Sequence, residues 1–103
     1  MTLNEDIKQK ITKRFLRDVG KPESKNMEEI YLDLLNGEHT IEVTISGKYT
    51  IAEVMYYRNE YKHHFVGVSS RNPKDTYNMY YGLRNSVEDA LTKLLEKFYN
   101  EEI

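Results

Sequence analysis

Apolar residues recur at helical spacing in three stretches of this chain of 103 residues and form strand-like runs in four others. Residues 2–19 make up the first helical stretch. Its apolar side chains follow one another at intervals of four positions: Leu3, Ile7, Ile11, Phe15 and Val19. This repeat predicts an amphipathic helix with one buried face. The helix is expected to end at Gly20-Lys21-Pro22, because the residue before a proline avoids helical backbone angles. Glu23 and Ser24 are then expected to be extended.

A short acidic helix is predicted between Asn26 and Gly37. Asn26 is a suitable N-cap, Glu29 three positions later completes a capping box, and Gly37 is a typical stop signal. The apolar stripe of this helix consists of Met27, Ile30, Tyr31 and Leu34. Glu29 and Asp33 lie one turn apart on one face, where like charges slightly destabilise a helix, so the pair has no evident role in folding. We interpret this face either as a solvated acidic surface or as an array of carboxylates that meets a basic partner.

Four strands are predicted after this helix. Residues 39–46 alternate strictly between apolar and polar side chains, which is typical of a half-buried strand. Residues 49–57 are apolar on both faces, so this strand is expected either to be covered on both sides or to present one face to a partner. Residues 63–69 and the tyrosine-rich residues 77–81 complete the set, and the loop between them has strong turn chemistry.

The final helix is predicted from a capping box formed by Ser86 and Asp89. Its buried stripe consists of Val87, Leu91, Leu94, Leu95 and Phe98. Because helices come first and last and the strands between them are joined by turns, the pattern predicts an α+β fold. We expect a single domain over residues 1–103, with an antiparallel sheet of four or five strands on which two N-terminal helices and one C-terminal helix pack.

Composition narrows the class of protein without naming a function. The chain has no cysteine and no apolar run long enough to span a membrane, and we expect a cytoplasmic protein without a secretory leader. The formal net charge of −2 is too small for a strong overall field. Thiol catalysis is excluded, and no pattern indicates a phosphate loop, a catalytic triad or a cofactor site. We therefore expect a binding module rather than an enzyme.

Two other patterns have plain alternative explanations. Basic residues recur on the polar side of the first helix: Lys10, Lys13, Arg14, Arg17 and Lys21. Such a stripe can bind nucleic acid phosphates, but it is more often a solvated helix face.

His63 and His64 are adjacent, and neighbours in a strand point to opposite faces, so the two are poorly placed to bind one metal ion.

Short motifs along most of the chain carry a family resemblance. The first are Met1-Thr2-Leu3, Lys8, Ile11-Thr12 and Phe15, followed by Met27-Glu28-Glu29-Ile30, Asp33 and Leu35. Further along come Ser46 with Lys48, Tyr56-Tyr57, Val66-Gly67-Val68, Leu83 and Asn85-Ser86-Val87. With these residues the chain resembles the staphylococcal uracil-DNA glycosylase inhibitors, small proteins carried on mobile genetic elements.

The resemblance implies a protein inhibitor that mimics DNA and occupies the DNA-binding groove of uracil-DNA glycosylase. That enzyme takes its target base out of the duplex, which requires a basic groove and an apolar wedge. Inhibitors of the family place carboxylates where phosphates lie and take up the wedge in an apolar pocket. By position, the resemblance implies these partner-binding residues: Glu23 and Ser24 in the segment that enters the groove, Glu28, Glu29 and Asp33 as phosphate-like charges, and Met27, Ile30 and Leu34, with Val54 or Tyr56, as pocket lining. Ordinary core is an equally good explanation of the last group.

Two further functions are compatible with the sequence. A different phage or mobile-element inhibitor, of the anti-CRISPR type, would bind a nuclease instead of the glycosylase. A small nucleic-acid-binding module would use the first helix, Arg71, Lys74 and the tyrosines, and its affinity would fall steeply with salt. The inhibitor hypothesis predicts a protein partner, with no direct nucleic acid, membrane, metal or cofactor.

Overall fold

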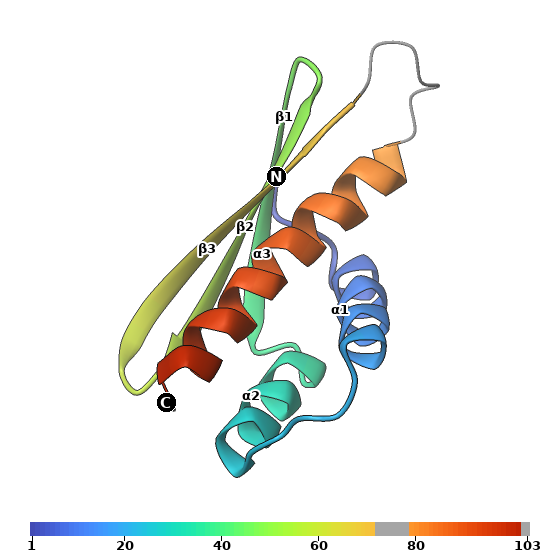
Figure 1. The fold of residues 1–103 in the computed structure, drawn as a ribbon. Coiled ribbons are helices and arrows are strands. Elements are labelled where there is room, and N and C mark those ends of the chain that lie inside the picture. The colour runs from blue at the N-terminus through green and yellow to red at the C-terminus, as the bar shows by residue number, and fades with distance from the viewer. Residues whose placement is uncertain (72–78, 102–103) are drawn as a thin grey trace.

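The computed structural model describes residues 1–71 and 79–101, and its fold is α+β (Figure 1). The elements are, in chain order, α1 (Glu5–Val19), α2 (Lys25–Leu35), β1 (His39–Ser46), β2 (Tyr49–Arg58), β3 (Tyr61–Ser70) and α3 (Met79–Glu101). The three strands form an antiparallel sheet in the order β1-β2-β3. α3 lies along β2 and β3, and α1 and α2 lie beside it (Figure 1). None of the helices in the described residues is long and apolar enough to cross a membrane.

The helices cover one face of the sheet. On β2 the side chains that point to this face are Thr50, Ala52, Val54 and Tyr56, and each of them is buried. Ile51, Met55 and Tyr57 point to the other face, where Tyr57 is 65% exposed. β2 is the central strand of the sheet. The described helices cover only one of its faces, so the expectation that it is covered on both sides is wrong.

The predicted number of four or five strands is wrong for the described part of the chain, whose sheet has three. The last three residues of the expected strand 77–81 form the first turn of α3, and its first two residues lie outside the described part. The reason is that helical periodicity continues upstream of Ser86. Leu83 is buried one turn before Val87 on the same stripe, so a longer helix buries more apolar surface against the sheet. This packing outweighs the strand propensity of the tyrosines.

Ser86 and Asp89, which were expected to cap the last helix, lie inside α3 and have other partners. The Ser86 hydroxyl donates to the carbonyl of Leu83 at 2.9 Å. The Asp89 carboxylate accepts a hydrogen bond from the backbone N–H of Val68 on β3 at 3.1 Å. Because Val68 belongs to an edge strand, this contact satisfies a backbone donor that the sheet leaves unpaired and fixes α3 against β3.

α1 begins at Glu5, three residues later than its apolar repeat predicts, because the first residues of the chain pair with β1. The N–H of Leu3 donates to the carbonyl of Ile41 at 2.8 Å. The side-chain oxygen of Asn4 then caps the helix by accepting a hydrogen bond from the N–H of Asp6 at 2.8 Å. The sheet edge therefore decides where α1 can start.

The buried face of α1 also differs from its row of five apolar residues. Ile7 is 40% exposed and Val19 is 51% exposed. Each residue turns the helix by about 100°, so a strict interval of four drifts by about 40° per step and the ends of the row leave the core. The buried positions are Lys8, Ile11, Thr12, Phe15 and Leu16. The buried face therefore includes a lysine and a threonine, at positions that lie outside the apolar row.

Lys8 is a buried lysine with three partners. Its ammonium contacts the Glu5 carboxylate at 2.9 Å and donates to the carbonyls of Gly37 and His39 at 3.0 and 2.5 Å. His39, the first residue of β1, is also buried, and its Nε2 lies 3.1 Å from the hydroxyl of Thr12. Burial and the charge of Lys8 lower the pKa of His39 to about 4. The contacts of Lys8 and His39 tie α1 to the connection between α2 and β1.

We expect acid to destabilise the protein through His39. A histidine in an unfolded chain has a pKa of about 6.5. As the pH falls below that value, the unfolded state binds a proton that folded His39 takes up only near its pKa of about 4. The stability that depends on neutral His39 is therefore complete above about pH 6.5 and is lost toward about pH 4, at up to about 1.4 kcal/mol per pH unit. Urea unfolding at about pH 7 and about pH 5 measures this loss.

His39→Gln is the matched variant, because glutamine is polar and does not titrate. The variant is expected to be less stable than the parent at neutral pH, and this deficit should shrink by about 2 kcal/mol at about pH 5. If the deficit stayed the same at both values of pH, His39 would not be the group that carries the acid sensitivity.

Candidate partner-binding site around the start of α2

Ser24 is the N-cap of α2. Its backbone is extended, with φ −142° and ψ 163°, and its hydroxyl accepts a hydrogen bond from the N–H of Met27 at 3.1 Å. Asn26, the predicted cap, lies inside the helix, where its side-chain oxygen accepts a hydrogen bond from the guanidinium of Arg58. The sequence offers both a serine and an asparagine as caps. The contact between Asn26 and β2 decides between them.

Glu29 and Asp33, the paired carboxylates of α2, have a structural role that the sequence did not reveal, because both lie close to Arg58. Its guanidinium lies 3.2 Å from the carboxylate of Glu29 and 3.8 Å from that of Asp33. The hydroxyl of Tyr56 donates to Asp33 at 2.5 Å. Asp33 also acts on Glu38, whose pKa it raises through a side-chain hydrogen bond and through its charge. Glu29 and Asp33 therefore hold α2 on β2 and have part of their charge compensated within the protein.

Most residues expected to line a wedge pocket belong to the core. Ile30, Leu34 and Val54 have no exposed surface, and Tyr56 is 1% exposed. These side chains fill the space between α2 and the sheet, which leaves no opening there for a partner's side chain. Met27, at the start of the same stripe, is the residue of this group that reaches a pocket.

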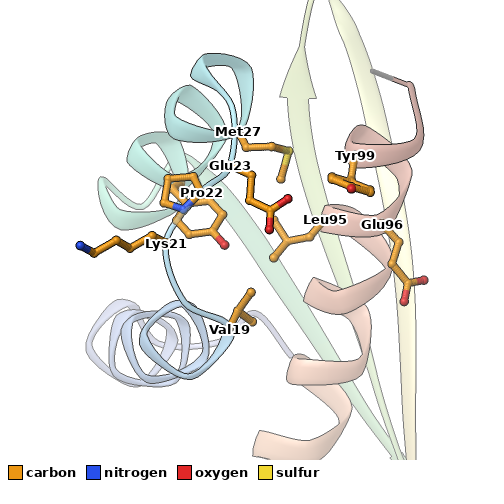
Figure 2. Close-up of a pocket in the computed structure, with 9 residues that line it drawn as sticks. Val19, Lys21, Pro22, Glu23, Met27, Leu95, Glu96 and Tyr99 are labelled. Carbon is orange, nitrogen blue, oxygen red and sulfur yellow. The ribbon is translucent and has the colours of Figure 1, made fainter. Parts of the chain in front are cut away.

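That pocket lies where the α1–α2 connection and α2 face the C-terminal half of α3 (Figure 2). Its volume is about 320 Å³. We call it the α2–α3 pocket, and it is lined by Val19, Lys21, Pro22, Glu23, Met27, Tyr31, Leu95, Glu96 and Tyr99. Of the predicted partner-binding residues, Glu23 and Met27 lie here, whereas Ser24, Glu28 and Glu29 belong to the adjacent first turn of α2 and its cap.

The charged side chains of the pocket point in different directions. Figure 2 shows the carboxylate of Glu23 directed from the α1–α2 connection toward Leu95 and Tyr99 of α3. The ammonium of Lys21 points away from the pocket, and the carboxylate of Glu96 lies at its outer rim (Figure 2). Partial burial and the charge of Glu23 raise the pKa of the Tyr31 phenol. Glu23 is therefore the negative charge that faces the pocket interior.

Three carboxylates at this end of the molecule have no cation partner among the described residues: Glu23, Glu28 and Glu96. Glu28 is exposed on the first turn of α2, directly beside the Glu29 that Arg58 binds. The site thus contains two kinds of carboxylate. Glu29 and Asp33 stabilise the fold, and the other three are available to a basic partner.

Sequence reasoning missed the contribution of α3 to this site. Leu95 was assigned to the buried stripe of the last helix, and Glu96 and Tyr99 carried no signal beyond helical spacing. The one usable sign was that Tyr99 lies off the stripe, and the structure leaves it 45% exposed. An aromatic residue off the apolar stripe often marks a contact surface, because it offers a large rigid area with a polar tip.

The other candidate features lie elsewhere. His63 packs on Phe98 with a ring separation of 5.1 Å, while His64 lies 3.5 Å from Glu53 on the opposite face of the sheet. In residues 1–71 and 79–101 no three His, Asp or Glu side chains are grouped so that they could hold a metal ion. On the basic stripe of α1, the Nε atoms of Arg14 and Arg17 each lie 4.0 Å from a carboxylate oxygen of Asp18, which partly compensates their positive charge.

Comparisons with protein-family models, curated proteins and solved structures gave no match to this chain.

Proposed function

We propose that this chain is a protein inhibitor that acts in the cytoplasm, mimics DNA and occupies the DNA-binding groove of uracil-DNA glycosylase. The observation that carries the proposal is a group of carboxylates without a cation partner among the described residues: Glu23 and Glu96 in the α2–α3 pocket and Glu28 on the adjacent first turn of α2. A DNA-binding groove is lined by lysines and arginines that neutralise phosphates, so it is complementary to such a group. The choice of the glycosylase as target rests on the resemblance of the sequence to the inhibitor family.

In this proposal the acidic residues of α2 have two tasks. Glu23 and Glu28 meet cations of the partner. Glu29 and Asp33 are bound to Arg58 and keep α2 fixed on β2 before the partner arrives. A surface that is ordered in advance loses little conformational entropy on binding, so more of the interaction energy appears as affinity.

The small net charge of the chain is compatible with this function. The formal net charge is −2, but exposed charges are screened over about 10 Å at moderate salt. The partner therefore responds to the charges near the contact rather than to the total. Lys10, Lys13, Arg14 and Arg17 lie on α1, a different helix from Glu28. Lys21 lines the pocket, but its ammonium points away from it (Figure 2).

Reversing the charge of Glu23 and Glu28 together is expected to weaken inhibition by about a hundredfold or more, since each substitution places a lysine against a basic groove. The assay is uracil excision by a bacterial glycosylase, with the inhibitor titrated at moderate salt and gel filtration used to detect a complex. The parent protein should inhibit stoichiometrically and elute with the enzyme, and Glu23→Lys/Glu28→Lys should do neither.

Asp6→Lys/Glu53→Lys is the matched control, because it changes the net charge by the same amount at exposed or half-exposed positions away from the pocket. This control should inhibit like the parent. Equal loss of inhibition in both double variants would show that total charge matters and the α2–α3 site does not. Absence of inhibition by the folded parent, tested on glycosylases from several bacteria, would contradict the assigned target.

A further inference from the structure

We infer that the α2–α3 pocket takes up the side chain of an arginine that the protein partner supplies. The inference rests on the proposed function for the existence of a protein partner and adds the chemical class of the group that enters the pocket. It differs from the expectation of an apolar wedge, which assumed a lining of Met27, Ile30 and Leu34, with Val54 or Tyr56.

The pocket combines the three features that a guanidinium side chain needs. Val19, Met27 and Leu95 offer apolar surface for the methylene stem. Tyr31 and Tyr99 offer aromatic rings on which a planar cation can stack. The Glu23 carboxylate faces the interior and has no cation partner among the described residues, so it can accept hydrogen bonds from the guanidinium (Figure 2).

An apolar occupant fits this lining less well. It would cover the Glu23 carboxylate and exclude water from it without supplying a partner, and burying an unpaired charge is unfavourable. Burial and, to a smaller extent, the negative charge of Glu23 raise the pKa of the Tyr31 phenol, which agrees with a carboxylate that faces the pocket.

The size of the pocket and a second site in the same chain support an arginine. A volume of about 320 Å³ is at the lower end of the range for ligand sites, about 300–1,000 Å³, and suits one side chain. The chain already binds one of its own arginines through carboxylates of α2. The guanidinium of Arg58 lies between the carboxylates of Glu29 and Asp33, and Asp33 in turn accepts a hydrogen bond from Tyr56.

The test uses the full chain labelled with ¹⁵N and titrated at constant ionic strength with N-acetyl-arginine N-methylamide. Two matched probes are the citrulline compound, which has the same shape without the charge, and the leucine compound, which represents an apolar wedge. The arginine probe should shift the amide signals of Glu23, Met27, Leu95 and Glu96. It should bind about fivefold more tightly than the citrulline probe, as one exposed ion pair allows.

Glu23→Gln should remove the preference for arginine over citrulline. Glu96→Gln, at the rim, should reduce it less, and Glu53→Gln, on the open face of the sheet, should leave it unchanged. Stronger binding of the leucine probe at the pocket, or no pocket shifts with the arginine probe, would overturn the inference. Inhibition without arginine binding would overturn this inference alone, and arginine binding without inhibition would overturn the proposed function alone.

Discussion

Gly67→Ala is expected to lower the free energy of unfolding by about 3–5 kcal/mol, because α3 packs directly on the backbone of β3 at this residue. A Cβ at position 67 would lie 1.9 Å from the carbonyl oxygen of Ser86 and 2.5 Å from the backbone nitrogen of Ala90. Both atoms belong to the helix backbone, so no side-chain rotation relieves the overlap and α3 has to move away from the sheet. Urea unfolding of the variant measures the loss.

Gly82→Ala is the matched control, since it adds the same methyl group elsewhere on the interface between α3 and the sheet. Its Cβ would meet the hydroxyl oxygen of Thr50 at 2.9 Å, a side-chain atom, and alanine is a better helix former than glycine. We expect a change of about 1 kcal/mol or less, because the two effects oppose each other. Similar stability of Gly67→Ala and Gly82→Ala would contradict close packing of α3 on β3.

Lys8→Ala is expected to cost about 3–5 kcal/mol, because it leaves two backbone carbonyls without their donor and a cavity in place of a buried side chain. Lys8 is 1% exposed, and its ammonium is the hydrogen-bond donor to the carbonyls of both Gly37 and His39. Without it these carbonyls lose a donor inside the protein, and a cavity forms between α1 and the α2–β1 connection. Thermal or urea unfolding at neutral pH measures the effect.

Lys13→Ala is the control for this substitution, because Lys13 lies exposed on the same helix. Its effect should stay within about 0.5 kcal/mol. Lys8→Met separates charge from volume: it fills the space but removes the cation that lowers the pKa of His39. In this variant the pKa of His39, followed by NMR, should rise above its value of about 4. An unchanged pKa would show that burial alone sets it.

The alternation of apolar and polar residues was sufficient to predict the positions of β1, β2 and β3. Strict alternation placed β1 at residues 39–46, which is where the structure has it. β2 and β3 begin and end within two residues of the expected ranges, and their turns contain the residues that adopt positive φ, such as Gly47 and Asn59. A strand with one buried face can be predicted in this way because its period of two is visible in five or six residues.

The same patterns failed where two kinds of structure compete for one segment. The tyrosines near residue 80 have high strand propensity. Residues 79–81 are nevertheless helical, because Leu83 and Val87 of the same helix are buried against the sheet. The interval of four along α1 likewise indicated Ile7 and Val19 as core residues, although the turn of the helix carries both of them toward solvent. In each case the packing partner of the segment, which is distant in the sequence, decides the outcome.

The sequence alone was enough to predict the α+β class, the apolar stripes of α2 and α3, and the concentration of carboxylates on α2. The tertiary structure alone decided what these carboxylates do, because Arg58 reaches Glu29 and Asp33 from a strand that lies more than twenty positions away. It also formed the α2–α3 pocket by bringing Glu23 and Leu95 together from opposite ends of the chain. Periodicity shows which face of a helix or strand is apolar. It does not show which element covers that face or where a pocket remains, because both depend on how all the elements pack together.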